Sequence, residues 1–77
     1  MQKIRPDLDL GKNIQKIRKS NKMTQDQVIA KLNLMGIQIS KSTYAKIETN
    51  RMNIKVSELI ALKQIFNVSF EEFFQGL

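Results

Sequence analysis

The stretch TQDQVIAKLNLMGIQISKSTYAKIET, residues 24–49, contains two helical patterns separated by a break. Thr24 can cap the first helix, and Gln27, three positions later, can reach back to complete a capping box. Apolar residues follow at helical spacing as far as Gly36, which can leave a helix in the left-handed conformation without a Cβ penalty. The pattern predicts a helix that continues to residue 34 or 35.

The second half of this stretch predicts another short helix. Ser40 can cap it, and Tyr44 and Ile47 share its inward face, so that the helix runs to about Thr49. Three polar residues remain on its outer face: Lys41, Ser42 and Lys46. A short helix, a turn containing Gly and a helix with a polar outer face form the plan of a helix-turn-helix, at about residues 24–49.

The rest of the chain also reads as helices. An apolar stripe at helical spacing predicts a first helix that starts after Asp7 or Asp9, both of which can accept hydrogen bonds from free N–H groups. A fourth helix is expected over about residues 56–66, and Ser69 opens a short fifth helix with a second capping box. The sequence holds no strand candidate. We expect one all-α domain of five helices over residues 1–77.

The charge of the chain is unevenly distributed. The net charge is +6, but residues 1–55 hold 12 Lys/Arg and 4 Asp/Glu, a balance of +8, whereas residues 56–77 hold one Lys and three Glu, a balance of −2. A basic surface suits a polyanion, because each neutralised phosphate releases counterions. The basic part of the chain therefore favours nucleic acid as a partner, although anionic membranes also attract basic proteins.

Composition excludes several classes of protein. Cys and His are absent, so a disulfide is impossible and a zinc site would need carboxylates alone. The sequence has neither a Gly-rich phosphate loop nor a paired nucleophile and base, and we expect no catalytic activity, no metal and no cofactor. No apolar run approaches the roughly 20 residues of a membrane span. We expect a cytoplasmic protein.

The ordered set of motifs resembles a known family. Residues 24–28, Lys31-Leu32 and residues 40–48 are similar to the Cro/CI (XRE) helix-turn-helix family of transcriptional regulators, and so is the step Asn67-Val68-Ser69. The resemblance extends from about residue 10 to residue 74. It implies a compact lambda-repressor-like domain that binds double-stranded DNA and is nucleoid-associated when bound.

The resemblance also implies roles by position. Residues on the outer face of the second helix of the motif would contact bases: Lys41, Ser42 and Lys46. Four residues around the motif would contact phosphates: Gln25, Thr43, Asn50 and Arg51. Arg18 and Glu48 match an ion pair that locks two helices together in many family members.

The sequence departs from the family pattern in the turn. A helix-turn-helix connector usually has about 3–4 residues, but here the first helix continues to residue 34 or 35 and residues 36–39 must still be crossed. We interpret Ile37 and Ile39 as anchors of this connector. Gln38 then becomes a candidate for an extra DNA contact.

Other interpretations stay open. Lys41, Ser42 and Lys46 could be an ordinary solvated face. Four aromatic residues near the C-terminus are chiefly core candidates, and part of the group could form a dimer surface: Phe66, Phe70, Phe73 and Phe74. Family members mostly act as repressors that bind palindromic operators as homodimers. The alternative is a protein-interaction module, such as an antitoxin or adaptor, that uses these Phe-rich helices; a regulatory protein partner is possible in either case.

Overall fold

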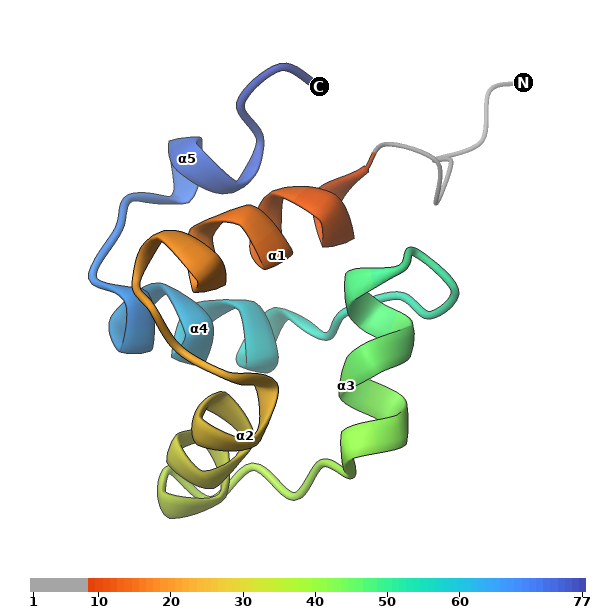
Figure 1. Ribbon diagram of the computed structural model, residues 1–77, viewed down its shortest axis with the longest axis vertical. Coiled ribbons are helices and arrows are strands. Elements are labelled where there is room, and N and C mark those ends of the chain that lie inside the picture. The colour runs from red at the N-terminus through yellow and green to blue at the C-terminus, as the bar shows by residue number, and fades with distance from the viewer. Residues whose placement is uncertain (1–8) are drawn as a thin grey trace.

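The computed structural model describes residues 9–77, and these form five helices (Figure 1). The helices are α1 (Leu10–Ser20), α2 (Gln25–Leu34), α3 (Lys41–Glu48), α4 (Val56–Phe66) and α5 (Phe70–Phe73). No strand occurs in the described residues, so the all-α prediction is confirmed. None of these helices has the length and apolar character needed to cross a membrane. The predicted start after Asp7 lies outside the described residues.

The two helices of the predicted motif begin at the expected caps. The Thr24 hydroxyl accepts a hydrogen bond from the amide of Gln27 at 3.1 Å, and the Thr24 amide donates to the Gln27 side chain at 2.9 Å. The Ser40 hydroxyl accepts from the amide of Thr43 at 3.1 Å. These bonds satisfy amide groups that a helix start leaves unpaired, so they fix where α2 and α3 begin.

The last two helices rely on a carboxylate that reaches back. The Lys55 amide donates to Glu58 at 2.8 Å, which explains how α4 starts after a residue that is a poor cap. The Ser69 amide donates to Glu72 at 3.3 Å at the start of α5. Both acidic side chains also lie in the first turn, where the helix dipole favours negative charge.

Helices α1, α2 and α3 end in the same way. A residue with positive φ follows each C-cap: Lys22 (58°), Gly36 (87°) and Asn50 (61°). The next amide then donates a hydrogen bond back to a carbonyl in the last turn, as in a Schellman motif. Each helix is therefore closed by local backbone geometry.

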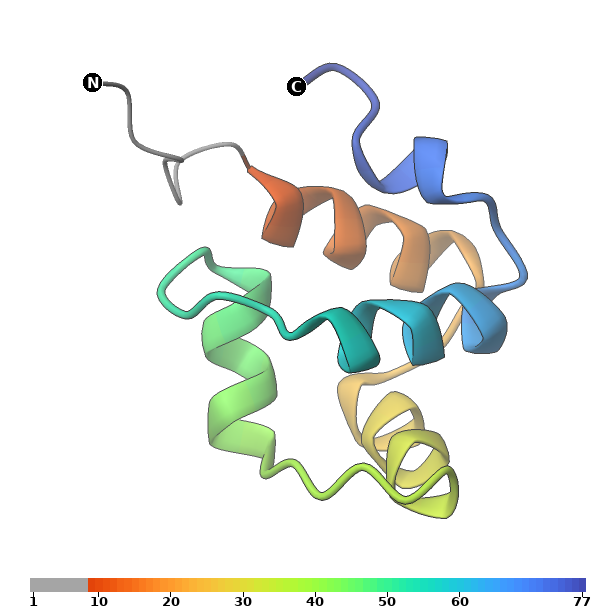
Figure 2. The same ribbon diagram turned by 180° about the vertical axis from the view of Figure 1, so that it is seen from behind.

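The helices surround one apolar core. In both views α1 lies between α5 and α4, and α2 lies on the far side of α4 (Figures 1 and 2). Helix α3 lies beside the start of α4, with its C-terminal end near the start of α1. Every helix contributes to the core, which consists of Ile14, Val28, Leu32, Tyr44, Ile47, Ala61, Leu62, Phe66 and Phe73. The Asn13 side chain holds α5 against α1 by donating to the carbonyls of Phe73, at 2.8 Å, and Gln75, at 3.0 Å.

The four phenylalanines divide between the core and the surface. Phe66 and Phe73 are 2% and 0% exposed, so the prediction of core residues is confirmed for these two, and including them in the possible dimer surface is wrong. They are buried because the inner sides of α4 and α5 converge on α1 and the core. Phe70 and Phe74 are 41% and 47% exposed, four residues apart on the outer side of α5.

The connector between α2 and α3 is held by its isoleucines. It spans residues 35–40, and Ile37 and Ile39 are half-buried against the core, as predicted, whereas Gln38 is exposed. Gly36, the second residue of the connector, has a φ of 87° and turns the chain away from α2. The longer turn is therefore an ordered segment anchored on the core.

Helix α1 lies close against the end of α3 at Gly11. A Cβ on this residue would collide with the carbonyl oxygen of Ile47. The Gly11 amide donates to the side-chain oxygen of Asn50 at 2.9 Å, and the Asn50 amide nitrogen donates to Asp9 at 3.0 Å. Asp9 precedes α1 as expected, but its backbone is left-handed (φ 56°) instead of extended, and its side chain makes no cap bond to the helix and accepts from Asn50.

We expect the Gly11→Ala substitution to destabilise the domain by about 1–3 kcal/mol, the usual cost of overpacking. Ala is ordinarily the better helix former by about 1 kcal/mol, but here the added methyl meets a backbone carbonyl that cannot rotate away. Urea unfolding followed by circular dichroism measures the change. Lys12→Ala, at the exposed neighbouring position, is the control and should change stability by less than about 0.5 kcal/mol. A G11A domain as stable as the parent would contradict the close α1–α3 contact.

Candidate nucleic-acid interface

The last residue of α3, Glu48, is a buried carboxylate that joins three helices. It is 3% exposed. The Nε of Arg18 in α1 donates to Glu48 Oε2 at 2.8 Å, and the Nη2 donates to Oε1 at 3.2 Å. In α2, the side-chain amide of Gln25 donates to the same Oε1 at 3.0 Å. The structure thus brings Arg18, Glu48 and Gln25 together in one network.

Arg18 also fixes the chain between α1 and α2. Its Nη1 donates to the carbonyl of Met23 at 2.9 Å, and the Met23 amide donates to the Arg18 carbonyl at 3.2 Å. Met23 immediately precedes the cap of α2. The guanidinium therefore connects the segment before α2 to the end of α3.

Protonation of this network follows from its contacts. Burial opposes the charge of Glu48, but the hydrogen bonds from Arg18 and Gln25 outweigh it, and the pKa of Glu48 lies below its usual value. The hydrogen bond to Glu48 raises the pKa of Arg18. Burial raises the pKa of Tyr44, which stays neutral and fully buried beside the pair. At neutral pH the network is a charged pair and a neutral phenol.

The opposite side of α3 faces solvent. Lys41, Ser42 and Lys46 are all exposed, whereas Tyr44 and Ile47 are buried on the inner side. Ser42 and Lys46 are four residues apart and therefore share one face of the helix. The side chains that the sequence assigned to bases are thus free to meet a ligand, on a helix held by its inner side.

Lys41 is the one residue of this group with an ionic partner among residues 9–77. Its ammonium lies 3.3 Å from Asp26 Oδ1, in the first turn of α2. Both side chains are exposed. The pair spans the two helices of the motif at the surface.

The predicted phosphate contacts have different environments. Gln25 is half-buried and donates to Glu48. The Thr43 hydroxyl accepts from Ser40 at 3.1 Å and is partly exposed. Arg51 is exposed, and its Nε donates to the Thr49 hydroxyl at 3.1 Å.

Asn50 differs from the other three. Its side-chain oxygen accepts from the Gly11 amide and its side-chain nitrogen donates to Asp9. Its own backbone amide donates to the carbonyl of Ile47 at 3.2 Å. Asn50 therefore acts within the fold, where it joins the end of α3 to the start of α1.

Comparison with known proteins assigns this arrangement to a family. A family model described as Helix-turn-helix matches residues 14–73, which include α2, α3 and the network at Glu48. The chain belongs to the Cro/CI-type (XRE) helix-turn-helix family. Neither a curated protein nor a solved structure gave a significant match.

Membership of this family makes the chain a DNA-binding helix-turn-helix protein of the transcription-regulator type. The resemblance predicted from residues 24–28, 31–32 and 40–48 is thereby confirmed. The matched range includes the connector at residues 35–40.

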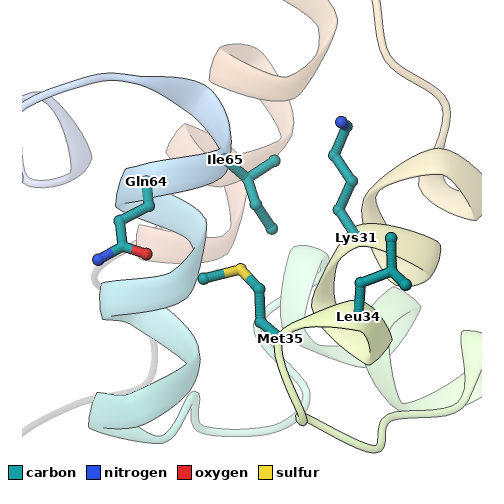
Figure 3. Close-up of a pocket in the computed structure, with 5 residues that line it drawn as sticks. All are labelled: Lys31, Leu34, Met35, Gln64 and Ile65. Atoms are coloured by element: carbon teal, nitrogen blue, oxygen red, sulfur yellow. The ribbon is translucent and has the colours of Figure 1, made fainter.

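The helix-turn-helix domain also has a shallow groove between α2 and α4 (Figure 3). Lys31, Leu34 and Met35 border it on one side, and Gln64 and Ile65 border it on the other. Its volume is about 370 Å³, and it is broadly open to solvent. None of the residues predicted to touch DNA lines it.

Sequence reasoning missed Asp26 and Gly11, and it gave Asn50 a different role. Asp26 has no signal in the sequence beyond its place in the first turn of a helix. Gly11 and Asn50 carry a weak signal, since a small residue early in α1 and an Asn after α3 are typical of close packing and of a left-handed helix end. Their contact joins positions 39 residues apart and could not be derived from local pattern.

We expect Arg18→Met to cost about 3–5 kcal/mol at pH 7, because it leaves the Glu48 carboxylate buried without its partner. That is comparable to the whole stability that a small core of this size supplies, so the variant should be largely unfolded at 25 °C by circular dichroism. The double variant R18M/E48L replaces the pair by apolar side chains and should recover a folded domain. An R18M domain with the stability of the parent would contradict the role of the pair.

Acidification should remove the contribution of the Glu48 carboxylate to the free energy of unfolding. Because its folded pKa is lowered from 4.5, the stabilisation is complete above about pH 4.5 and is lost as the pH falls through the folded pKa. We expect the difference in urea midpoint between the parent and Glu48→Gln to narrow from pH 7 to pH 3. Glu71→Gln, an exposed carboxylate on α5, should leave the pH profile of the parent unchanged. A constant difference between the parent and E48Q would show that Glu48 is not the titrating group.

Proposed function

We propose that this helix-turn-helix protein is a transcriptional repressor that binds a palindromic operator as a homodimer and occludes polymerase. In this proposal it acts in the cytoplasm, at the nucleoid. The observation that carries the proposal is the outer face of α3, where Lys41, Ser42 and Lys46 are exposed on a helix whose inner side is clamped by Glu48. A rigid helix with polar outer side chains is suited to the major groove.

The proposed base contacts follow from side-chain chemistry. A lysine ammonium can donate to O6 and N7 of guanine, and a serine hydroxyl can either donate or accept. Lys41 and Ser42 occupy the first turn of α3, which enters the groove in helix-turn-helix complexes, and Lys46 lies one turn later. We assign these three residues to base readout.

The proposed phosphate contacts are Gln25, Thr43 and Arg51. The Gln25 amide has two N–H groups, and because one is used by Glu48 the other remains for a phosphate. Thr43 keeps a hydroxyl hydrogen to donate, and the terminal nitrogens of Arg51 are free of hydrogen bonds to residues 9–77. Asn50 contributes by holding the end of α3, since both ends of its side-chain amide are engaged within the fold.

The proposed homodimer uses the outer surfaces of α4 and α5. Large apolar side chains are exposed there: Val56 (74%), Ile60 (43%), Phe70 (41%) and Phe74 (47%). A small domain that exposes such residues gains stability by burying them against a second copy. Two copies related by a twofold axis would address half-sites about one helical turn, roughly 34 Å, apart.

The decisive experiment is binding to DNA. Selection from random duplexes should return a sequence with twofold symmetry, and titration of that duplex should show a steep log–log dependence on salt. We expect Lys41→Ala and Ser42→Ala each to weaken binding to the selected duplex by about 1–3 kcal/mol for each lost base contact. The loss on a scrambled duplex should be smaller.

Lys16→Ala, at an exposed lysine on α1, is the matched control and should leave the preference between the two duplexes unchanged. Equal losses of K41A and S42A on both duplexes would mean that they touch only phosphate. Binding that is undetectable or independent of salt would contradict the proposal and favour a protein-interaction module.

A further inference from the structure

The contact between Asp26 and Lys41 places a carboxylate at the edge of the proposed DNA-binding face. The Lys41 ammonium lies 3.3 Å from Oδ1 and 3.5 Å from Oδ2 of Asp26, so it is shared between the two oxygens. Lys46 and Arg51, the other cations of this face, have no carboxylate within 4 Å among residues 9–77. The pairing therefore singles out the first residue of α3.

Fold stability does not account for this pair. The side chains of Lys41 and Asp26 are 62% and 72% exposed, and an ion pair in that setting contributes about 0–1 kcal/mol. Helix α3 is already positioned by its cap at Ser40 and by the buried network at Glu48. We therefore expect the pair to affect the binding of DNA to this surface, and not the stability of the fold.

A carboxylate close to DNA weakens binding to every DNA sequence. It repels phosphates, and it keeps the Lys41 ammonium from swinging to the nearest backbone oxygen. An ammonium has three N–H donors, so Lys41 can keep Asp26 and still donate to acceptors on a base edge. The pair thus weakens the contact of Lys41 with DNA phosphates more than its contact with a matching base.

We propose that Asp26 is a specificity-determining residue, which holds Lys41 for base readout and lowers the affinity for non-cognate DNA. The proposal rests on the proposed function, since it requires that Lys41 face a groove. It predicts that removing the Asp26 carboxylate raises the affinity for DNA of any sequence and lowers the ratio of affinities between cognate and non-cognate DNA.

The test compares Asp26→Asn with the parent full chain on two probes, the duplex selected by the parent and a scrambled duplex of the same composition. We expect D26N to bind the scrambled duplex about three- to tenfold more tightly at low salt. The log–log salt slope should steepen by about 1, because Lys41 becomes free to neutralise one more phosphate. Affinity for the selected duplex should change less, so the ratio of the two affinities should fall at least threefold.

Two further variants identify the cause. Glu71→Gln changes the net charge by the same amount on α5, away from α3, and should affect both duplexes by less than about twofold, in line with screening of distant exposed charges. In a Lys41→Met background, D26N should no longer steepen the salt slope, because the effect passes through the ammonium. Thermal melting of each variant verifies that the fold is retained.

The outcomes separate the two proposals. If K41M leaves binding to both duplexes unchanged, Lys41 does not face DNA and the proposed base contact fails. If K41M weakens binding to the selected duplex but D26N behaves like E71Q, the role of Asp26 is overturned while the proposed function stands. A D26N loss confined to the selected duplex would also overturn it, because Asp26 would then read a base itself.

Discussion

A charge buried at the end of α3 organises this domain. Glu48 accepts hydrogen bonds from α1 through Arg18 and from α2 through Gln25, so a single carboxylate ties three helices together. Taking an ion pair out of water costs several kcal/mol per ion, and well-placed hydrogen bonds must offset this cost. Here two contacts from one guanidinium and a third donor from Gln25 do so. Unlike apolar packing, these contacts have direction, and they fix how α3 sits on its neighbours.

The same network joins the interior of the domain to its proposed binding surface. Gln25 uses one amide hydrogen on Glu48 and keeps the other, so a side chain that locks the fold can also serve the proposed phosphate contact. On the far side of α3, Lys41 and Lys46 remain in solvent. A helix that is rigid on its inner side loses little further freedom on binding, which favours discrimination between sequences.

The parts of this structure that the sequence predicts are those with local signals. The starts of α2 and α3 are marked by cap bonds between residues only three apart, made by Thr24 with Gln27 and by Ser40. Gly36 marks the end of α2, so both helices can be predicted from short-range chemistry. The family resemblance predicted, in addition, that Arg18 is the ionic partner of Glu48. Contacts between distant segments had no such signal: whether Phe73 or Phe74 faces inward depends on where α5 meets α1. The Asp26–Lys41 contact likewise depends on how α2 meets α3.

The long turn illustrates why the fold tolerates a departure from the family pattern. Three contacts with α1 hold the C-terminal end of α3: Glu48 binds Arg18, the Asn50 side chain accepts from the Gly11 amide, and Gly11 lies close against the carbonyl of Ile47. The connector over residues 35–40 enters α3 at its other end and has only to bury its isoleucines and deliver Ser40 to the cap. The longer turn is accommodated because the contacts at Glu48 and Asn50 that hold the end of α3 do not involve it.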